Sequence, residues 1–179
     1  MLGVFCGLLA AWFLGRPESA RPDLPEYAVL RQIIVQRTCP SDRVVVIVNS
    51  TRPAYPMLVQ LGRRTVGRYV TCFPIAFFYA GVEPTANRPV YRRYDEAPAE
   101  ERLFLDELRD DVKRFQPKLI IVHDTPGWYG LPKGFNTFEY LRYSGWTEQS
   151  LESYREVPGP LGWKVFERMS SPAAIATTR

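Results

Sequence analysis

The sequence predicts an α/β protein with an open, Rossmann-like, three-layer arrangement: a mostly parallel sheet between helices, a C-terminal antiparallel β-hairpin and an N-terminal hydrophobic helix. Three observations predict this fold. The runs 43–48 and 118–122 are apolar on both faces, which is typical of parallel strands covered on both sides. Helical patterns alternate with these strands. Residues 152–168 alternate polar and apolar side chains around Pro-Gly-Pro-Leu-Gly, a pattern typical of a hairpin.

The chain begins with an uncharged apolar segment, MLGVFCGLLAAWFLG at 1–15. It is shorter than the roughly 20 residues that span a bilayer, and it lacks the basic start of a secretory signal. It could be a poor signal sequence, a buried core helix or the end of a transmembrane helix. The abrupt change to a charged, proline-rich linker at 16–25 favours the last. We expect an α/β domain at 26–168 and a flexible tail at 169–179.

The first half of the domain alternates helix and strand. Residues 26–38 have the spacing of an amphipathic helix, and the strand 43–48 follows a turn. A short helix over 54–64 and a second strand over 67–73 come next. Residues 74–97 form a connection interrupted by prolines.

The second half contains the clearest helical pattern of the chain. Leu105, Leu108, Val112 and Phe115 make one apolar stripe, which predicts a helix over 98–116. The third strand, 118–122, follows Pro117, and a further helix is predicted over 135–143 before the hairpin.

Composition excludes several classes of site. The net charge of +4 is modest, and a single histidine rules out paired-histidine metal or catalytic motifs within this chain. No GxGxxG, P-loop, GxSxG or CxxC motif is present. We therefore identify no catalytic residue and expect neither cofactor nor metal. Cys39 and Cys72 fall at opposite ends of the predicted sheet, so we expect no disulfide between them.

Polar residues follow two of the predicted strands, where open α/β sheets bind ligands. They are Asn49, Ser50, Thr51, His123 and Asp124. Asp124 beside the only histidine could act as an acid/base pair. The alternative is that Asn49 and Asp124 merely cap the turns that follow.

The apolar run at 73–81 lies in a connection and could face a membrane or a partner. Its candidate membrane-facing residues are Phe73, Ile75, Phe77, Phe78 and Tyr79. The alternative is a short helix that faces the core. Arginines interleaved with aromatics at 63–69 and 91–94 suggest nucleic acid only weakly, and we expect no nucleic-acid partner.

The order of these parts resembles the C-terminal extramembrane domain of bacterial GT-C-type membrane glycosyltransferases, the superfamily of the dolichyl-phosphate-mannose–protein mannosyltransferases. The segments that carry the likeness are 1–15, RVVVIVNS (43–50), FPIAFFY (73–79), EERLFLDEL (100–108), PKLIIVHDTPGW (117–128) and GWKVFER (162–168).

The resemblance implies an enzyme that moves a sugar from a polyprenyl-phosphate carrier on the extracytoplasmic side of a membrane. The acidic catalytic residues of such enzymes lie in a loop between the first two transmembrane helices, to which nothing here corresponds. The chain is then a non-catalytic domain, whose partners are the transmembrane part of the same enzyme and a lipid-linked sugar. Two alternatives stay open: a free-standing small-molecule enzyme or binder that uses the strand ends, and a membrane-tethered interaction module.

Overall fold

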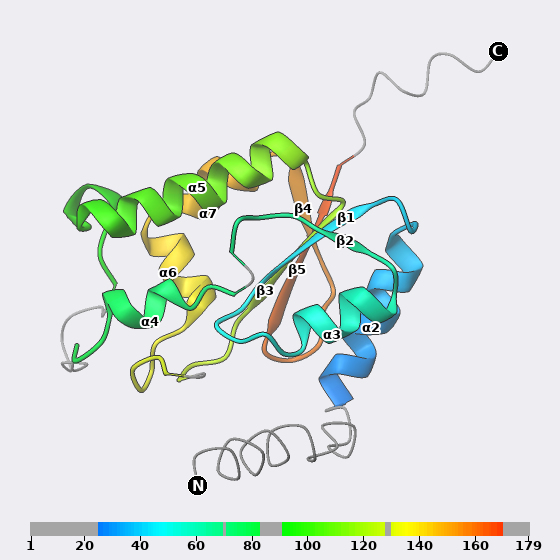
Figure 1. The fold of residues 1–179 in the computed structure, drawn as a ribbon, viewed down its shortest axis with the longest axis horizontal. Coiled ribbons are helices and arrows are strands. Elements are labelled where there is room, and N and C mark those ends of the chain that lie inside the picture. The colour runs from blue at the N-terminus through cyan, green and yellow to red at the C-terminus, as the bar shows by residue number, and fades with distance from the viewer. Residues whose placement is uncertain (1–24, 70, 83–90, 128–129, 170–179) are drawn as a thin grey trace, which may run out of the picture.

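The computed structural model describes residues 25–69, 71–82, 91–127 and 130–169, and Figure 1 shows how they are arranged. The predicted N-terminal helix at 1–15, most of the linker and most of the tail lie outside these residues. The elements are α2 (Pro25–Arg37), β1 (Arg43–Ile47), α3 (Ala54–Gln60), β2 (Arg64–Thr65), α4 (Pro74–Phe78), the 3₁₀ turn η2 (Tyr94–Glu96), α5 (Ala99–Phe115), β3 (Leu119–His123), α6 (Thr137–Tyr143), α7 (Trp146–Ser150), β4 (Tyr154–Val157) and β5 (Trp163–Arg168).

The strands form one five-stranded sheet in the order β2-β1-β3-β5-β4. β1 is parallel to β2 and to β3, whereas β5 is antiparallel to both β3 and β4. The fold is therefore mixed α/β with four strands running one way. The prediction of an α/β fold with a mostly parallel sheet is confirmed, and of the predicted hairpin the structure shows the antiparallel pairing of β4 with β5.

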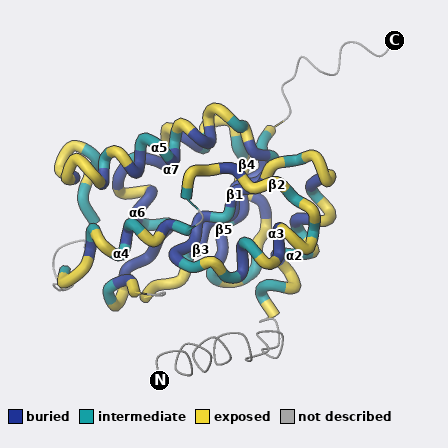
Figure 2. The backbone as a smooth tube through the Cα atoms, in the orientation of Figure 1, coloured by how far each residue is buried: buried dark blue, intermediate teal, exposed yellow. Residues whose placement is uncertain are grey.

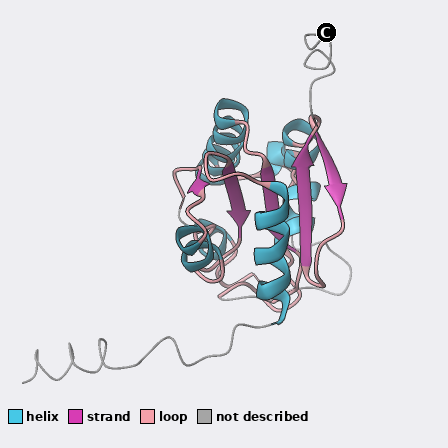
Figure 3. Ribbon diagram, turned by 90° about the vertical axis from the view of Figure 1, so that its right-hand side faces the viewer, coloured by secondary structure: helices cyan, strands magenta, loops and turns pink. Residues whose placement is uncertain are grey.

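Helices cover both faces of this sheet (Figure 3). Apolar side chains of α2 and α3, such as Leu30 and Met57, pack on one face of β1 and β3. Those of α4, α5, α6 and α7, such as Ile75 and Leu108, pack on the other face. Figure 2 shows the buried central strands between these exposed helix surfaces. All five residues of β3 are buried, which explains why its sequence is apolar on both sides.

No helix within the described ranges is long and apolar enough to cross a membrane.

The prediction of a strand over 67–73 is wrong. The strand that pairs with β1 is the two-residue β2, and the chain then turns away at Gly67, whose φ is +117°. The backbone N–H of Arg68 donates to Asp111 on α5 (2.8 Å), and the hydroxyl of Tyr69 donates to Glu107. These contacts bind the segment to α5, where it cannot continue along the sheet edge.

The connection predicted at 74–97 contains two helical turns, α4 and η2. The sequence reading also missed α7, which packs Trp146 into the core. Each element has five residues or fewer, so none repeats an apolar position often enough to show a helical period.

Candidate functional site

The carboxyl ends of β1 and β3 lie side by side because the two strands are parallel neighbours. Val48 continues the chain beyond β1, and its carbonyl accepts a hydrogen bond from the backbone N–H of Cys72 (2.9 Å). The polar residues predicted after these strands therefore gather at one edge of the sheet, which we call the carboxyl edge.

Asn49, Ser50 and Thr51 turn the chain from β1 into α3. Asn49 is buried, whereas Ser50 is half-buried and Thr51 is exposed. The Ser50 hydroxyl accepts from the N–H of Arg52 (3.2 Å), and the Thr51 carbonyl accepts from the N–H of Tyr55 (3.0 Å). Ser50 and Thr51 thus belong to the turn that leads into α3.

His123 ends β3 and is only 2% exposed. Its ring packs edge-on against Trp163 of β5, with 4.8 Å between ring centroids. Burial disfavours the charged imidazolium, and the neighbouring Asp124 only partly offsets this, so the pKa of His123 falls from 6.5 to about 4. Near neutral pH His123 is therefore a neutral, packed side chain.

Asp124 makes different contacts. Its backbone N–H donates to the Gly162 carbonyl (2.7 Å), and its Oδ1 accepts from Nδ2 of Asn136 (2.8 Å). Asn136 in turn caps α6 by accepting from the N–H of Glu139 (3.0 Å), and its own N–H donates to the Tyr91 hydroxyl (2.9 Å). The carboxylate is thus joined to the start of α6, while His123 packs against Trp163.

The sequence reading did not single out Asn136 or Tyr91. The pattern Asn136-x-x-Glu139 is typical of a helix start and could have located the cap. Its link to Asp124 joins residues 12 apart in sequence, so only the fold reveals it.

An open depression of about 480 Å³ lies beside Asp124. Its wall is the β4–β5 turn, which includes Leu161 and Gly162, together with Glu156 and Lys164. A small polar molecule would meet one carboxylate of Asp124 and the paired charges of Lys164 and Glu156, which are 2.9 Å apart. Among the described residues that line the depression, the other two titratable side chains, Glu156 and Lys164, are paired with each other.

The five predicted membrane-facing residues separate into two groups. Phe73 and Phe77 are exposed, and their rings contact each other edge-on with centroids 5.4 Å apart. Ile75 and Tyr79 are wholly buried in the core, and Phe78 is half-buried. Residues four apart share one side of a helix, so α4 buries one side and exposes the other.

A buried ion pair fixes α4 and the start of α5. Glu101 is fully buried, and its carboxylate accepts from Arg92 (2.8 Å) and from the Tyr79 hydroxyl (2.9 Å). The guanidinium of Arg92 also lies over the Tyr79 ring, 4.8 Å from its centroid. Arg92, one of the arginines interleaved with aromatics, therefore has a packing role.

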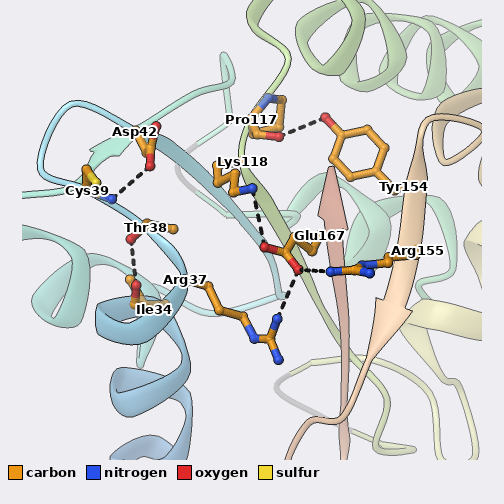
Figure 4. Close-up of polar contacts among 10 residues, drawn as sticks. All are labelled: Ile34, Arg37, Thr38, Cys39, Asp42, Pro117, Lys118, Tyr154, Arg155 and Glu167. Carbon is orange, nitrogen blue, oxygen red and sulfur yellow. Dashed lines mark hydrogen bonds and ion pairs between the residues drawn. The ribbon is translucent and has the colours of Figure 1, made fainter. Parts of the chain in front are cut away.

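A second polar cluster lies at the opposite, amino edge of the sheet (Figure 4). Glu167 of β5 contacts Arg37 (2.9 Å), Lys118 (3.3 Å) and Arg155 (3.1 Å), which come from α2, the start of β3 and β4. Burial opposes ionisation of Glu167, but hydrogen bonds from Arg155 and Lys118 outweigh it and lower its pKa. One carboxylate thus joins three elements.

Within the part of the chain that the structure describes, no three His, Cys, Asp or Glu side chains are grouped so that they could hold a metal ion. Cys39 is exposed and Cys72 is buried, and both are free thiols, which confirms that they form no disulfide. Comparisons with known protein families, curated proteins and solved structures found no significant match.

Proposed function

We propose that this chain is a non-catalytic, extracytoplasmic domain of a membrane glycosyltransferase that takes its sugar from a polyprenyl-phosphate carrier. Its partners would be the transmembrane part of the same enzyme and the lipid-linked sugar. The described sheet supports a Rossmann-like arrangement: β2 and β3 flank β1, with α3 on one face and α5 on the other.

One observation carries the proposal. The apolar segment 1–15 leads through the linker into Pro25, the first residue of α2. Arg37, at the end of α2, contacts Glu167 at the amino edge, so the helix starts about 20 Å away, toward the carboxyl edge. The start of α2 and the helix α4 therefore belong to the same side of the domain, the lower side in Figure 1.

Fractionation of native cells tests this proposal, with an antibody raised against α5. We expect the antigen in the membrane fraction, in a protein several times heavier than 20.6 kDa. The purified 179-residue chain should turn over no polyprenyl-phosphate sugar. A soluble antigen of 20.6 kDa, or transfer by the chain alone, would contradict the proposal.

The Asp124–Asn136–Tyr91 network favours a second candidate, a free-standing small-molecule binder at the carboxyl edge. In a sheet with this strand order, the crevice between the ends of β1 and β3 is where ligands bind. Asp124 stands at the β3 side of that crevice, and the open depression beside it lies toward the β4–β5 turn.

Two substitutions separate a binding role of Asp124 from a structural one. Asp124→Asn keeps an oxygen that accepts from Asn136 but removes the charge, whereas Asp124→Ala also breaks the hydrogen bond and should destabilise the fold by about 1 kcal/mol. If the site binds a cationic or hydroxylated ligand, Asp124→Asn abolishes the ligand-dependent thermal shift and leaves the melting temperature of the free protein unchanged. Equal ligand shifts in the wild type and Asp124→Asn would exclude this role.

A further inference from the structure

We propose that the carboxyl edge lies directly against the lipid bilayer interface. The contact is made by Phe73, which immediately precedes α4, by Phe77 of α4 and by Leu161 of the β4–β5 turn. This inference rests on the proposed function, because it takes residues 1–15 as the end of a membrane helix. It adds the lipid interface as a partner and Leu161 as a contact residue.

These three side chains belong to the large apolar groups that are exposed among the described residues, which also include Val59 and Leu103 on other elements. Phe73 is 49% exposed, Phe77 is 71% exposed and Leu161 is 98% exposed. Scattered single apolar residues on a surface need no explanation. Here, however, two separate elements present them at one edge, and both elements hold them firmly.

α4 is held rigidly beneath its exposed phenyl pair. The ring of the buried Tyr79 packs against Phe135, with 4.8 Å between centroids, and its hydroxyl donates to Glu101. The backbone N–H of Cys72, the residue before Phe73, donates a hydrogen bond to the carbonyl of Val48, just beyond β1. The phenyl pair therefore cannot turn into the core, because that side of the helix is already filled.

The β4–β5 turn is held as firmly. A Cβ at Gly162, whose φ is +81°, would lie 2.3 Å from Oγ1 of Thr125, and one at Gly159 would lie 2.9 Å from Val165. The Gly162 carbonyl accepts from the N–H of Asp124, which follows β3. The turn is therefore packed against the carboxyl end of β3, and its Leu161 side chain projects into solvent.

The position of the chain's apolar segment identifies the bilayer as the occupant of this surface. The ten residues 16–25 span at most about 35 Å when fully extended. With residues 1–15 in the membrane, the start of α2 must lie within that distance of the bilayer. Because α2 starts toward the carboxyl edge, this attachment favours an orientation in which the edge that carries Phe73, Phe77 and Leu161 faces the bilayer, and aromatic side chains favour the bilayer interface.

Depth-dependent fluorescence quenching tests the contact on the full chain in vesicles of phosphatidylcholine and phosphatidylglycerol. The background carries Cys6→Ser and Cys39→Ser. Cys72 stays, because it is buried and burial raises the pKa of its thiol to about 12, so it does not take the label. A polarity-sensitive probe is then attached after Phe77→Cys or Leu161→Cys.

The matched control is Lys113→Cys, which places the probe on an exposed residue near the end of α5. That end leads into the start of β3 and so belongs to the amino edge. We expect a nitroxide on the lipid headgroup to quench the probes at 77 and 161 and to leave the probe at 113 unquenched. Phe73→Ser with Phe77→Ser should weaken quenching at 161, whereas Val59→Ser, an exposed valine of α3, should not.

Failure of the inference and failure of the proposed function give different results. Flotation in a density gradient first shows whether the chain binds the vesicles. If it does, but the probes at 77 and 161 stay as bright as the probe at 113, the lipid contact is refuted and membrane attachment stands. If the chain does not float, the membrane anchor of the proposed function fails, and the inference fails with it. A photo-crosslinker at position 77 that labels a protein and no lipid in native membranes would assign this edge to the transmembrane part of the enzyme and overturn the lipid contact.

Discussion

Acidification provides a direct test of the buried histidine at the end of β3. The pKa of His123 is about 4 in the folded protein, against 6.5 for the exposed side chain. Between these pH values the unfolded chain binds a proton that the folded protein does not. Stability therefore falls as pH decreases through this window, and the loss is complete only below pH 4.

The size of this loss follows from the two pKa values. A pKa difference of about 2.5 corresponds to a loss of about 3.4 kcal/mol in the free energy of unfolding once His123 is protonated in both the folded and the unfolded chain. At pH 5, where the unfolded histidine is almost fully protonated and the folded one is mostly neutral, the loss relative to pH 7 is about 2 kcal/mol. Because His123 is 2% exposed, solvent screening reduces this figure little.

Denaturant unfolding of the wild type and His123→Gln at pH 7 and pH 5 measures the loss. The variant lacks the titrating group, so the wild type should lose about 2 kcal/mol more than the variant between the two pH values. Because the chain has one histidine, a single NMR imidazole resonance reports its pKa directly. A midpoint near 6.5, or equal pH dependence in both proteins, would refute the assignment of a buried neutral imidazole.

Two further predictions concern the ion pairs. Glu167→Gln should lower the free energy of unfolding at pH 7 by about 1–2 kcal/mol. This is less than the loss of a fully buried ion pair would cost, because the cationic partners of Glu167 are partly exposed. The stabilisation is present above the ordinary carboxylate pKa and is lost as pH falls through the lowered pKa of Glu167. Denaturant titration measures it, with Glu156→Gln as an exposed control expected to change stability by less than about 0.5 kcal/mol. Arg92→Met leaves the buried Glu101 carboxylate without its cation and should destabilise by about 3 kcal/mol. Adding Glu101→Gln should restore part of that loss in a thermal-unfolding cycle, and additive losses would show that the two side chains are not coupled.

The long and strongly patterned elements could be predicted from sequence alone. The apolar stripe through Leu105 and Leu108 located α5 to within one residue at each end, and the apolar strands β1 and β3 were located equally well. These segments carry enough repeats for periodicity to identify them. The segment 67–73 was wrongly predicted as a strand because its polar and apolar side chains alternate. Its polar groups instead bind Glu107 and Asp111 of α5, which lie about 40 residues away in sequence.

The candidate site was predictable only in its position. Polar residues after two parallel strands must meet at one edge of the sheet, and Asn49 and Asp124 do. Which groups they contact depends on packing that local sequence does not encode. Asp124 accepts a hydrogen bond from Asn136, and the His123 ring packs against Trp163. The apolar run at 73–81 separates into buried and exposed sides only because α4 packs against α5.

The two edges of the sheet differ in a way that bears on how the domain would sit at a membrane. At the amino edge, Glu167 contacts Arg37, Lys118 and Arg155, and these four side chains together carry a net charge of +2. At the carboxyl edge, Phe73, Phe77 and Leu161 are exposed on rigid supports. Charged side chains remain hydrated most easily away from hydrocarbon, whereas phenyl and leucine side chains gain by leaving water. For a domain anchored to a membrane as proposed, this contrast favours the orientation in which the start of α2 and the carboxyl edge face the bilayer and the Glu167 cluster faces away from it.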